Sequence, residues 1–231
     1  MSADELKRRA AAAAVDLVRP EMVLGLGTGS TAAHFIALIG EKVRAGLYVS
    51  AVPTSDDTAR KAAAAGIELI EPDETTIIDL AVDGTDEVDA RKNLIKGGGG
   101  ALLREKIIAR AARKFVVIAD ASKKVAELGA FPLPVEIDRF AFSLTVRAVR
   151  ETLAALGYAG REVRLRAGPA GPAFISDGGN FILDCGLARI GDAAALDKAL
   201  GAIPGVIETG LFIGVADEVL LAGPEGLERI V

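Results

Sequence analysis

Three short stretches hold most of the residues in this sequence that could do chemistry. The first is "GLGTGST" at 25–31, a glycine-punctuated run that leads into a helical pattern. The second is "VDGTDEVD" at 82–89, and the third is "NLIKGGGGALLREKII" at 93–108. Between them they supply hydroxyls, carboxylates, lysine and glycine N–H groups, which are the groups that bind anions and transfer protons.

The first stretch has the composition of an anion-binding turn. Its glycines let backbone N–H groups point inward, and the helix that follows would add its N-terminus. A dinucleotide loop fails because Ser30 stands where G-x-G-x-x-G ends, and because "LYVSAVPTS" at 47–55 ends in hydroxyls rather than an acid. A Walker loop lacks its G-K-[ST]. The residues alone leave two interpretations, a small phosphate site or a plain tight turn.

The second stretch places four carboxylates in one loop, and three interpretations remain open. Asp83, Asp86, Glu87 and Asp89 could form a solvated acidic turn, a site for Mg²⁺ or Ca²⁺, or an acid and base acting on a neutral sugar. The 1-3-5 spacing of a calcium loop with its distal glutamate is absent. That absence weighs against the metal.

The third stretch is the most specific signal in the chain. Each glycine costs conformational entropy on folding, so the run at 97–100 predicts close approach of the backbone to a ligand or another loop. Glu105 falls near the start of the next predicted helix, flanked by Arg104 and Lys106. Such a glutamate is ordinarily a surface charge, and its position beside the glycines and Lys96 makes it the candidate base.

Alternating strands and helices must position these stretches. The alternation predicts a parallel sheet covered by helices on both faces, with ligands beyond the carboxyl ends of its strands. Strands are predicted at 22–26, 47–52, 67–70, 77–83 and 114–120, and helices at 30–44, 55–66 and 101–112.

After residue 131 the pattern changes to β-α-β-β-α. It consists of helices at 143–156 and 192–200, strands at 162–167, 173–176 and 181–185, and turns at 168–172 and 177–180. We therefore predict an α/β protein in which 1–130 plus 204–231 form a Rossmann-like domain. A smaller α+β domain of the ferredoxin-like, split βαβ type, at 131–203, is inserted near the C-terminus.

Composition limits the function class. The 231 residues carry a formal net charge of −5, so no basic field is available for nucleic acid. One cysteine and one histidine exclude a Cys/His zinc site and an internal disulfide. No apolar run approaches the roughly 18 residues that span a bilayer. We expect a soluble, cytoplasmic protein without a membrane partner.

Three other residues receive structural interpretations. His34 is expected to pack against a neighbouring helix. Cys185 is expected to be a buried apolar residue, because no second histidine could activate it. Lys7, in the first predicted helix, could reach a bound phosphate, but it is expected to be solvated.

In this order and at these intervals, the three stretches resemble the type A ribose-5-phosphate isomerases. The resemblance continues through essentially the whole chain. Its further motifs are "IADASKKV" at 118–125, "FPLPVEI" at 131–137, "DGGNFILD" at 177–184 and "IPGVIETGLF" at 203–212. The family usually carries DGADE where this chain has Thr85, a change that keeps both aspartates.

The resemblance implies a role for each candidate residue. Glu105 would be the general base that moves a proton between C1 and C2 of the open-chain sugar, in the non-oxidative pentose phosphate pathway. Asp83 and Lys96 would serve ring opening and proton handling at the sugar oxygens, and Asp86 would bind a hydroxyl. The implied substrate-binding residues are Thr28, Gly29, Ser30, Thr31, Asp83, Gly84, Thr85, Asp86, Lys96, Gly97, Gly98, Gly99 and Lys123.

The resemblance also implies that the enzyme needs no metal and no organic cofactor, takes a small sugar phosphate and forms a homodimer. Two rival functions remain at this point. A coenzyme A transferase would use Glu105 as a nucleophile rather than a base. A sugar-phosphate sensor would bind without turnover, although the helix-turn-helix and basic face usual in such sensors are not evident.

Overall fold

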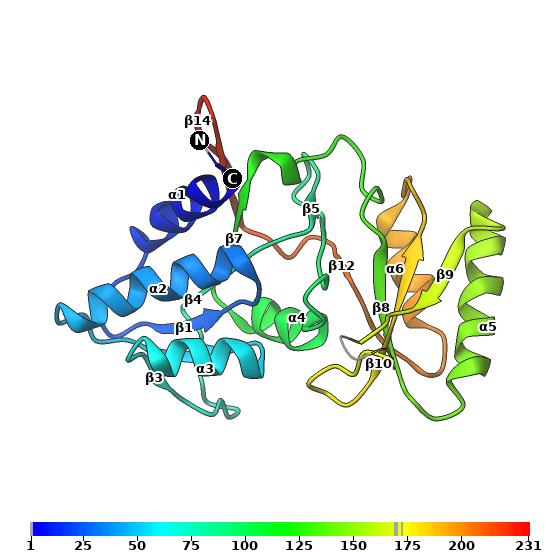
Figure 1. The fold of residues 1–231 in the computed structure, drawn as a ribbon, viewed down its shortest axis with the longest axis horizontal. Coiled ribbons are helices and arrows are strands. Elements are labelled where there is room, and N and C mark those ends of the chain that lie inside the picture. The colour runs from blue at the N-terminus through cyan, green and yellow to red at the C-terminus, as the bar shows by residue number, and fades with distance from the viewer. Residues whose placement is uncertain (1, 169–170, 172) are drawn as a thin grey trace. The chain divides into compact units, whose positions relative to one another are not determined.

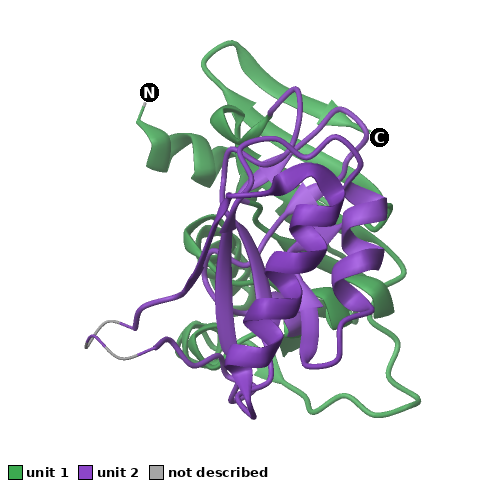
Figure 2. Ribbon diagram, turned by 90° about the vertical axis from the view of Figure 1, so that its right-hand side faces the viewer, with its two compact units in different colours: residues 1–85, 104–124, 214–231 green, residues 86–103, 125–213 purple. Residues whose placement is uncertain are grey.

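The computed structural model describes residues 2–168, 171 and 173–231, and these divide into two compact units (Figure 2). Unit 1 comprises residues 1–85, 104–124 and 214–231, and unit 2 comprises 86–103 and 125–213. Residues 169, 170 and 172 of the turn predicted at 168–172 lie outside the described part of the chain.

Unit 1 is built on a sheet whose described strands run in the order β14-β13-β7-β4-β1-β2-β3. The strands are β1 (Val23–Leu26), β2 (Ser50–Pro53), β3 (Glu68–Leu69), β4 (Leu80–Asp83), β7 (Phe115–Asp120), β13 (Glu218–Gly223) and β14 (Gly226–Ile230). The β13–β14 hairpin is antiparallel and the other pairings are parallel. Strand order therefore reverses between β1 and β4, as in a Rossmann fold, and ligands bind beside such a reversal.

Helices cover both faces of this sheet, as the alternating pattern predicts. The helices that contribute to unit 1 are α1 (Ala3–Val15), α2 (Ser30–Arg44), α3 (Asp56–Ala64), α4 (Leu102–Ala111) and the short 3₁₀ helix η1 (Ala121–Lys123). Helix α1 begins with the reciprocal capping box of Ser2 and Glu5. None of the described helices combines the length and apolar composition that crossing a bilayer requires.

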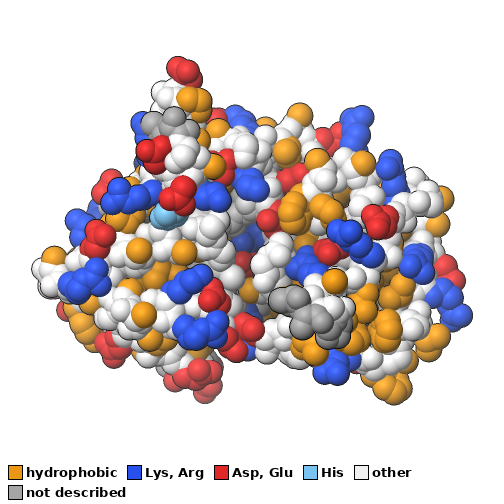
Figure 3. Space-filling view, in the orientation of Figure 1, with side chains coloured by type: hydrophobic (Ala, Val, Ile, Leu, Met, Phe, Trp, Pro, Cys, Tyr) orange, Lys and Arg blue, Asp and Glu red, His pale blue; other side chains and the backbone are white. Residues whose placement is uncertain are grey.

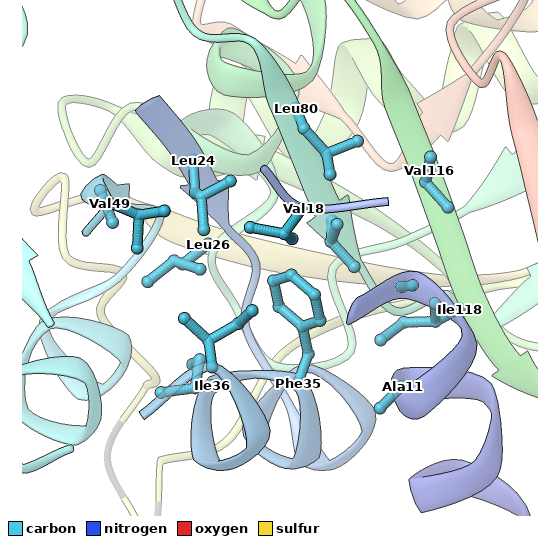
Figure 4. Packing of buried hydrophobic residues seen from close by; sticks show 14 of the residues in the cluster. Ala11, Val18, Leu24, Leu26, Phe35, Ile36, Val49, Leu80, Val116 and Ile118 are labelled. Atoms are coloured by element: carbon cyan, nitrogen blue, oxygen red, sulfur yellow. The ribbon is translucent and has the colours of Figure 1, made fainter. Parts of the chain in front are cut away.

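The core of unit 1 lies between the sheet and helices α1 and α2 (Figures 1 and 4). Leu24 and Leu26 project from the same face of β1 because alternate residues of a strand share a face, and Phe35 of α2 packs against them. Full burial of such a phenylalanine contributes roughly 1.5–3 kcal/mol. On the opposite face, Ile108 of α4 lies against Gly25, so α4 covers that side.

Unit 2 contains an antiparallel sheet whose described strands run in the order β11-β8-β10-β9. Leu133, Val135 and Ile137 of β8 share one face, on which they pack with both helices. The chain order β-α-β-β-α-β is the predicted split βαβ arrangement. Its elements are β8 (Leu133–Ile137), α5 (Phe142–Leu153) with a π turn η2 (Ala154–Tyr158), β9 (Glu162–Leu165), β10 (Phe181–Gly186), α6 (Ala193–Gly201) and β11 (Val206–Thr209).

The structure differs from the sequence-based expectations in two places. Residues 173–176 form no strand in the described structure, because Ala173 and Ile175 make isolated bridges only. Residues 86–103 and 125–130, expected with 1–130, fall in unit 2, as do 204–213. The reason is strand pairing, since β6 (Leu94–Ile95) pairs with both β5 (Glu87–Val88) and β12 (Leu211–Phe212).

Candidate active site

The glycine turn after β1 and the acidic loop after β4 meet at the reversal of strand order in unit 1. Gly27 N–H donates to the carbonyl of Val82 at 2.9 Å, and Thr28 N–H donates to Oδ1 of Asp83 at 3.1 Å. Two of the three stretches identified in the sequence are thus bonded to each other, at the edge where a Rossmann-like sheet binds its ligand.

Asp83 is held tightly against this turn. Its side chain is 3 % exposed, and Oδ1 also accepts the N–H of Gly84 at 2.7 Å. A Cβ on Gly27 would stand 2.1 Å from Cγ and Oδ1 of Asp83, a distance that no real side chain shows. Residue 27 must therefore be glycine for the carboxylate to lie where it does.

Three buried hydroxyls, those of Thr54, Ser55 and Thr58, form hydrogen bonds with the same turn. The Thr28 hydroxyl lies 2.8 Å from that of Thr54, 2.9 Å from that of Ser55 and 3.2 Å from that of Thr58. Thr58 also donates to the carbonyl of Gly27 at 2.9 Å. Thr54, Ser55 and Thr58 were not among the predicted site residues, although the hydroxyls at the end of the second predicted strand were a signal for them.

Helix α2 opens the anion-binding half of the site. Its N-cap, Gly29, has φ +105° and no side chain to cap the first turn, so N–H groups there remain available to a ligand. Lys7 is half-buried and donates from Nζ to Oγ of Ser30 at 3.0 Å in a solvent-exposed hydrogen bond, a contact that the interpretation as a solvated side chain did not include. Spacing could have revealed it, because Lys7 stands one helical turn before the buried Ala10 and Ala11.

Three more predicted residues lie at this edge of the sheet. A Cβ on Gly84 would lie 3.7 Å from Cβ of Thr31, so the acidic loop packs beside the first turn of α2, and Thr85 follows directly. Lys123 ends η1, which leaves the carboxyl end of β7 next to β4. The Asp120 side chain caps η1 by accepting the N–H of Ser122 at 3.1 Å.

Glu105 is buried rather than solvated, with 5 % of its surface exposed. It lies in the first turn of α4, three residues before Ile108, on the face that covers Gly25. The chain leaves α4 at Ala112, which bridges to Ile78 just before β4. The other end of α4, with Glu105, therefore points toward the carboxyl ends of β1 and β4. Its neighbour Arg104 points outward to Asp56, 2.9 Å away.

The remaining acidic residues belong to unit 2 and differ in their tasks. Gly98 N–H donates to Oδ2 of Asp86 at 2.8 Å, and this bond connects the acidic loop to the glycine loop. Glu87 is buried and accepts the N–H groups of Gly129 and Phe131. Asp89 accepts several donors within its own turn. The solvated-turn interpretation is wrong for Glu87 and Asp89, which are structural.

Lys96 and the glycine loop complete the candidate residues of unit 2. The Lys96 side chain is 2 % exposed, and its ammonium lies 5.6 Å from the ring centroid of Phe212. Gly97 and Gly100 have φ values of +105° and +85°, so the run contains two positions that favour glycine. Gly98 and Gly99 between them are exposed.

The other residues noted in the sequence have structural surroundings. The His34 ring contacts Asp4 of α1 at 2.9 Å, which agrees with a role in helix packing. Cys185 lies in the core of unit 2, where burial raises the pKa of its thiol to about 12. Among the described residues, no group of three or more Asp, Glu, His or Cys is placed to hold a metal ion.

Comparison with known proteins identifies the family. The profile of ribose 5-phosphate isomerase A (phosphoriboisomerase A) matches residues 50–226. The chain is 56 % identical over 230 residues to the ribose-5-phosphate isomerase A of Rhodopseudomonas palustris strain BisB18, covering 100 % of this chain and 99 % of that protein. This chain belongs to the ribose-5-phosphate isomerase A family. The corresponding isomerase of Methylorubrum populi is 54 % identical over 231 residues, with coverage of 100 % and 98 %.

Solved structures of the same family have the same fold as this chain. The chain superimposes on ribose 5-phosphate isomerase A of Methanocaldococcus jannaschii with a TM-score of 0.90 at 40 % identity, covering 99 % of each chain. A D-ribose-5-phosphate isomerase in complex with phospho-erythronic acid matches with a TM-score of 0.92 at 40 % identity and the same coverage. The predicted α/β fold and the prediction of an isomerase are thereby confirmed.

Replacing Gly27 by alanine tests the close approach of Asp83 to the turn. We expect Gly27→Ala to lower the free energy of unfolding by about 1–3 kcal/mol, the cost of overpacking a tight site. Urea denaturation followed by circular dichroism measures it. The matched control is Gly201→Ala at the end of α6, where an added Cβ meets nothing within 4 Å. Equal stability of the two variants would show that Asp83 moves aside freely.

Proposed function

We propose that this chain interconverts D-ribose 5-phosphate and D-ribulose 5-phosphate through an enediolate, with Glu105 as the general base. The observation that carries this proposal is the burial of Glu105 at the start of α4, directed toward the sheet edge that bears Asp83 and the glycine turn. A carboxylate kept from water there is placed to work on a bound ligand, which a surface charge is not.

The phosphate of the sugar would bind at the start of α2. Ser30 and Thr31 offer hydroxyls beside the first-turn N–H groups, and Lys7 already contacts Ser30. Lys123 adds a second cation at the same sheet edge. The chain carries a net charge of −5, and in the face shown in Figure 3 basic and acidic side chains are interspersed. Local geometry, not a broad basic field, would therefore recognise the phosphate.

The chemistry needs one base and a stabilised oxyanion. Glu105 would take the proton from C2 of the aldose and return it to C1. A second proton must pass from O2 to O1 to give the ketose, and Asp83 and Lys96 would handle this transfer at the sugar oxygens. A positioned base contributes roughly 10²- to 10⁴-fold to such a step, and fixed donors at the enediolate oxygen contribute roughly 10²- to 10³-fold. Lys96 and the glycine N–H groups would supply these donors. Asp83 and Lys96 would also assist ring opening, and Asp86 would bind a sugar hydroxyl.

The remaining parts of the proposal follow from the family resemblance. The enzyme would act in the cytoplasm, in the non-oxidative pentose phosphate pathway, without a metal or an organic cofactor. It would form a homodimer. Exposed apolar side chains suitable for self-association lie near the start of α5, where Phe140 is 87 % and Leu144 58 % exposed.

An assay of ribulose 5-phosphate formation with EDTA present separates the proposed activity from its rivals. We expect turnover of ribose 5-phosphate to survive exhaustive chelation and to need no nucleotide, because base and oxyanion donors are protein groups. Binding without turnover would indicate a sensor, and a trapped acyl-enzyme thioester would indicate a coenzyme A transferase. Loss of activity restored by a divalent cation would contradict the metal-free mechanism.

Phosphate recognition is tested by combining Ser30→Ala with Lys123→Ala. We expect KM for ribose 5-phosphate to rise far more than kcat falls, because each lost charge-assisted contact is worth about 1.5–3 kcal/mol. Arg60→Ala, which removes an exposed cation from α3, serves as a control for the loss of charge. An unchanged KM in the double variant would place the phosphate elsewhere.

The assignment of the base is tested with Glu105→Gln, which keeps the shape of the side chain and removes the proton acceptor. We expect substrate to bind and kcat to drop by at least ~10²-fold. Asp83→Asn provides the contrast, because a group that serves mainly ring opening matters less for an open-chain substrate.

Ribulose 5-phosphate is that substrate, since without a free C5 hydroxyl it cannot close a furanose ring. Exchange of its C1 proton in D₂O, followed before the steady state, reports proton abstraction alone. We expect Glu105→Gln to abolish this exchange and Asp83→Asn largely to keep it. Rapid exchange in Glu105→Gln would end the assignment of Glu105 as the base.

A further inference from the structure

Arg166 directly follows β9 in unit 2, and every part of its guanidinium has a partner. Nη1 donates to the carbonyls of Gly97 at 2.8 Å and Gly98 at 3.2 Å. Nη2 and Nε donate to the carboxylate of Asp184 at 2.6 Å and 3.2 Å. Both side chains of this ion pair are 13 % exposed, so water screens it little. Neither Arg166 nor Asp184 was among the predicted site residues.

The surroundings hold the guanidinium in one place. The backbone N–H of Arg166 donates to Ile182 and its carbonyl accepts from Phe174, each at 2.8 Å. The Phe174 ring lies 5.8 Å from the guanidinium carbon. The same ring packs against Gly100, where an added Cβ would stand 2.4 Å from it. The glycine loop is therefore held by hydrogen bonds from Arg166 and by packing against Phe174.

These bonds determine how two peptide planes of the loop face. In a trans peptide the carbonyl and the next N–H point in opposite directions, and the described residues contain no cis peptide. The Gly97 carbonyl binds Arg166 while the Gly98 N–H binds Asp86, so the first plane is fixed at both ends. The Gly98 carbonyl also binds Arg166, and the Gly99 N–H must therefore point away from it.

We propose that Arg166, held by Asp184, is a positioning residue for the isomerisation: it aims the exposed Gly99 N–H at an oxygen of the sugar-phosphate enediolate. This inference rests on the proposed function. A donor that is already fixed in place does not have to reorient when negative charge develops on the enediolate oxygen. A glycine loop without the hydrogen bonds from Arg166 would sample many orientations. Arginine suits the task because its planar fork binds two carbonyls and a carboxylate at once, which a lysine ammonium cannot do.

The test compares Arg166→Lys with Arg164→Lys. Arg164 is exposed on the same face of β9, and its side chain makes no hydrogen bond or ion pair with a described residue. The control therefore repeats the chemical change without the contacts to the glycine loop. We expect Arg166→Lys to lower kcat about tenfold to a hundredfold, with KM for ribose 5-phosphate within about twofold of wild type. Arg164→Lys should match wild type in both constants.

A second readout separates positioning from general damage. Phospho-erythronic acid carries a planar carboxylate that resembles the enediolate oxygens, while inorganic phosphate reports the phosphate site alone. We expect Arg166→Lys to weaken inhibition by phospho-erythronic acid by a factor similar to the loss in kcat, and to leave inhibition by inorganic phosphate unchanged. Equal weakening of both inhibitors would overturn the proposal, as would kcat equal to that of Arg164→Lys.

If Arg166→Lys does not fold, Asp184→Asn provides the test instead. It keeps the shape of the Asp184 side chain but removes the charge that holds the Arg166 guanidinium in place. It should show the same split between the two inhibitors, and it should add little to Arg166→Lys when the two are combined. Full activity and unchanged inhibition in Asp184→Asn would also overturn the proposal. Wild-type turnover is measured first, since its absence would remove the proposed function, whereas an unaffected Arg166→Lys would remove this inference alone.

Discussion

The carboxylate of Asp83 lies directly against the backbone of the turn after β1, and the other features of unit 1 follow from that approach. It is possible because residue 27 has no side chain, and it is maintained by the N–H groups of Thr28 and Gly84. The turn, its hydroxyl cluster and the start of α2 are thereby joined to the end of β4. The reversal of strand order makes these two strand ends neighbours, which gives the ligand edge its position.

Burial of charge distinguishes the candidate residues from ordinary surface groups, although burial alone does not identify function. Asp83, Lys96 and Glu105 are each at most 5 % exposed, and removing a charge from water is costly unless the fold compensates for it. Glu87 is equally buried, yet two backbone N–H groups of its own unit occupy its carboxylate. Asp83 likewise accepts two backbone N–H groups, so what distinguishes it from Glu87 is its position at the end of β4, at the sheet edge where ligands bind.

In unit 2 the main structural constraint is different: contacts from other segments fix the conformation of the glycine loop at 97–100. Glycine allows the positive φ values of the loop but provides no side chain to fix them. Asp86, Arg166 and Phe174 supply that order from three separate segments, through one N–H, two carbonyls and a packed ring. A flexible backbone held by rigid surroundings thus has its first two peptide planes fixed in orientation.

By itself the sequence determined what local pattern can determine: the alternation of strands and helices, the anion-binding turn, the candidate base Glu105 and the family. It did not determine that 86–103 belong with unit 2, that Glu87 and Asp89 are structural, that Lys7 reaches Ser30, or that Arg166 clamps the glycine loop. Each of these depends on residues far apart in the chain, as with Arg166 and Gly97, 69 positions apart. Periodicity and turn chemistry act over a few residues, whereas strand pairing and buried ion pairs arise only when distant segments fold together.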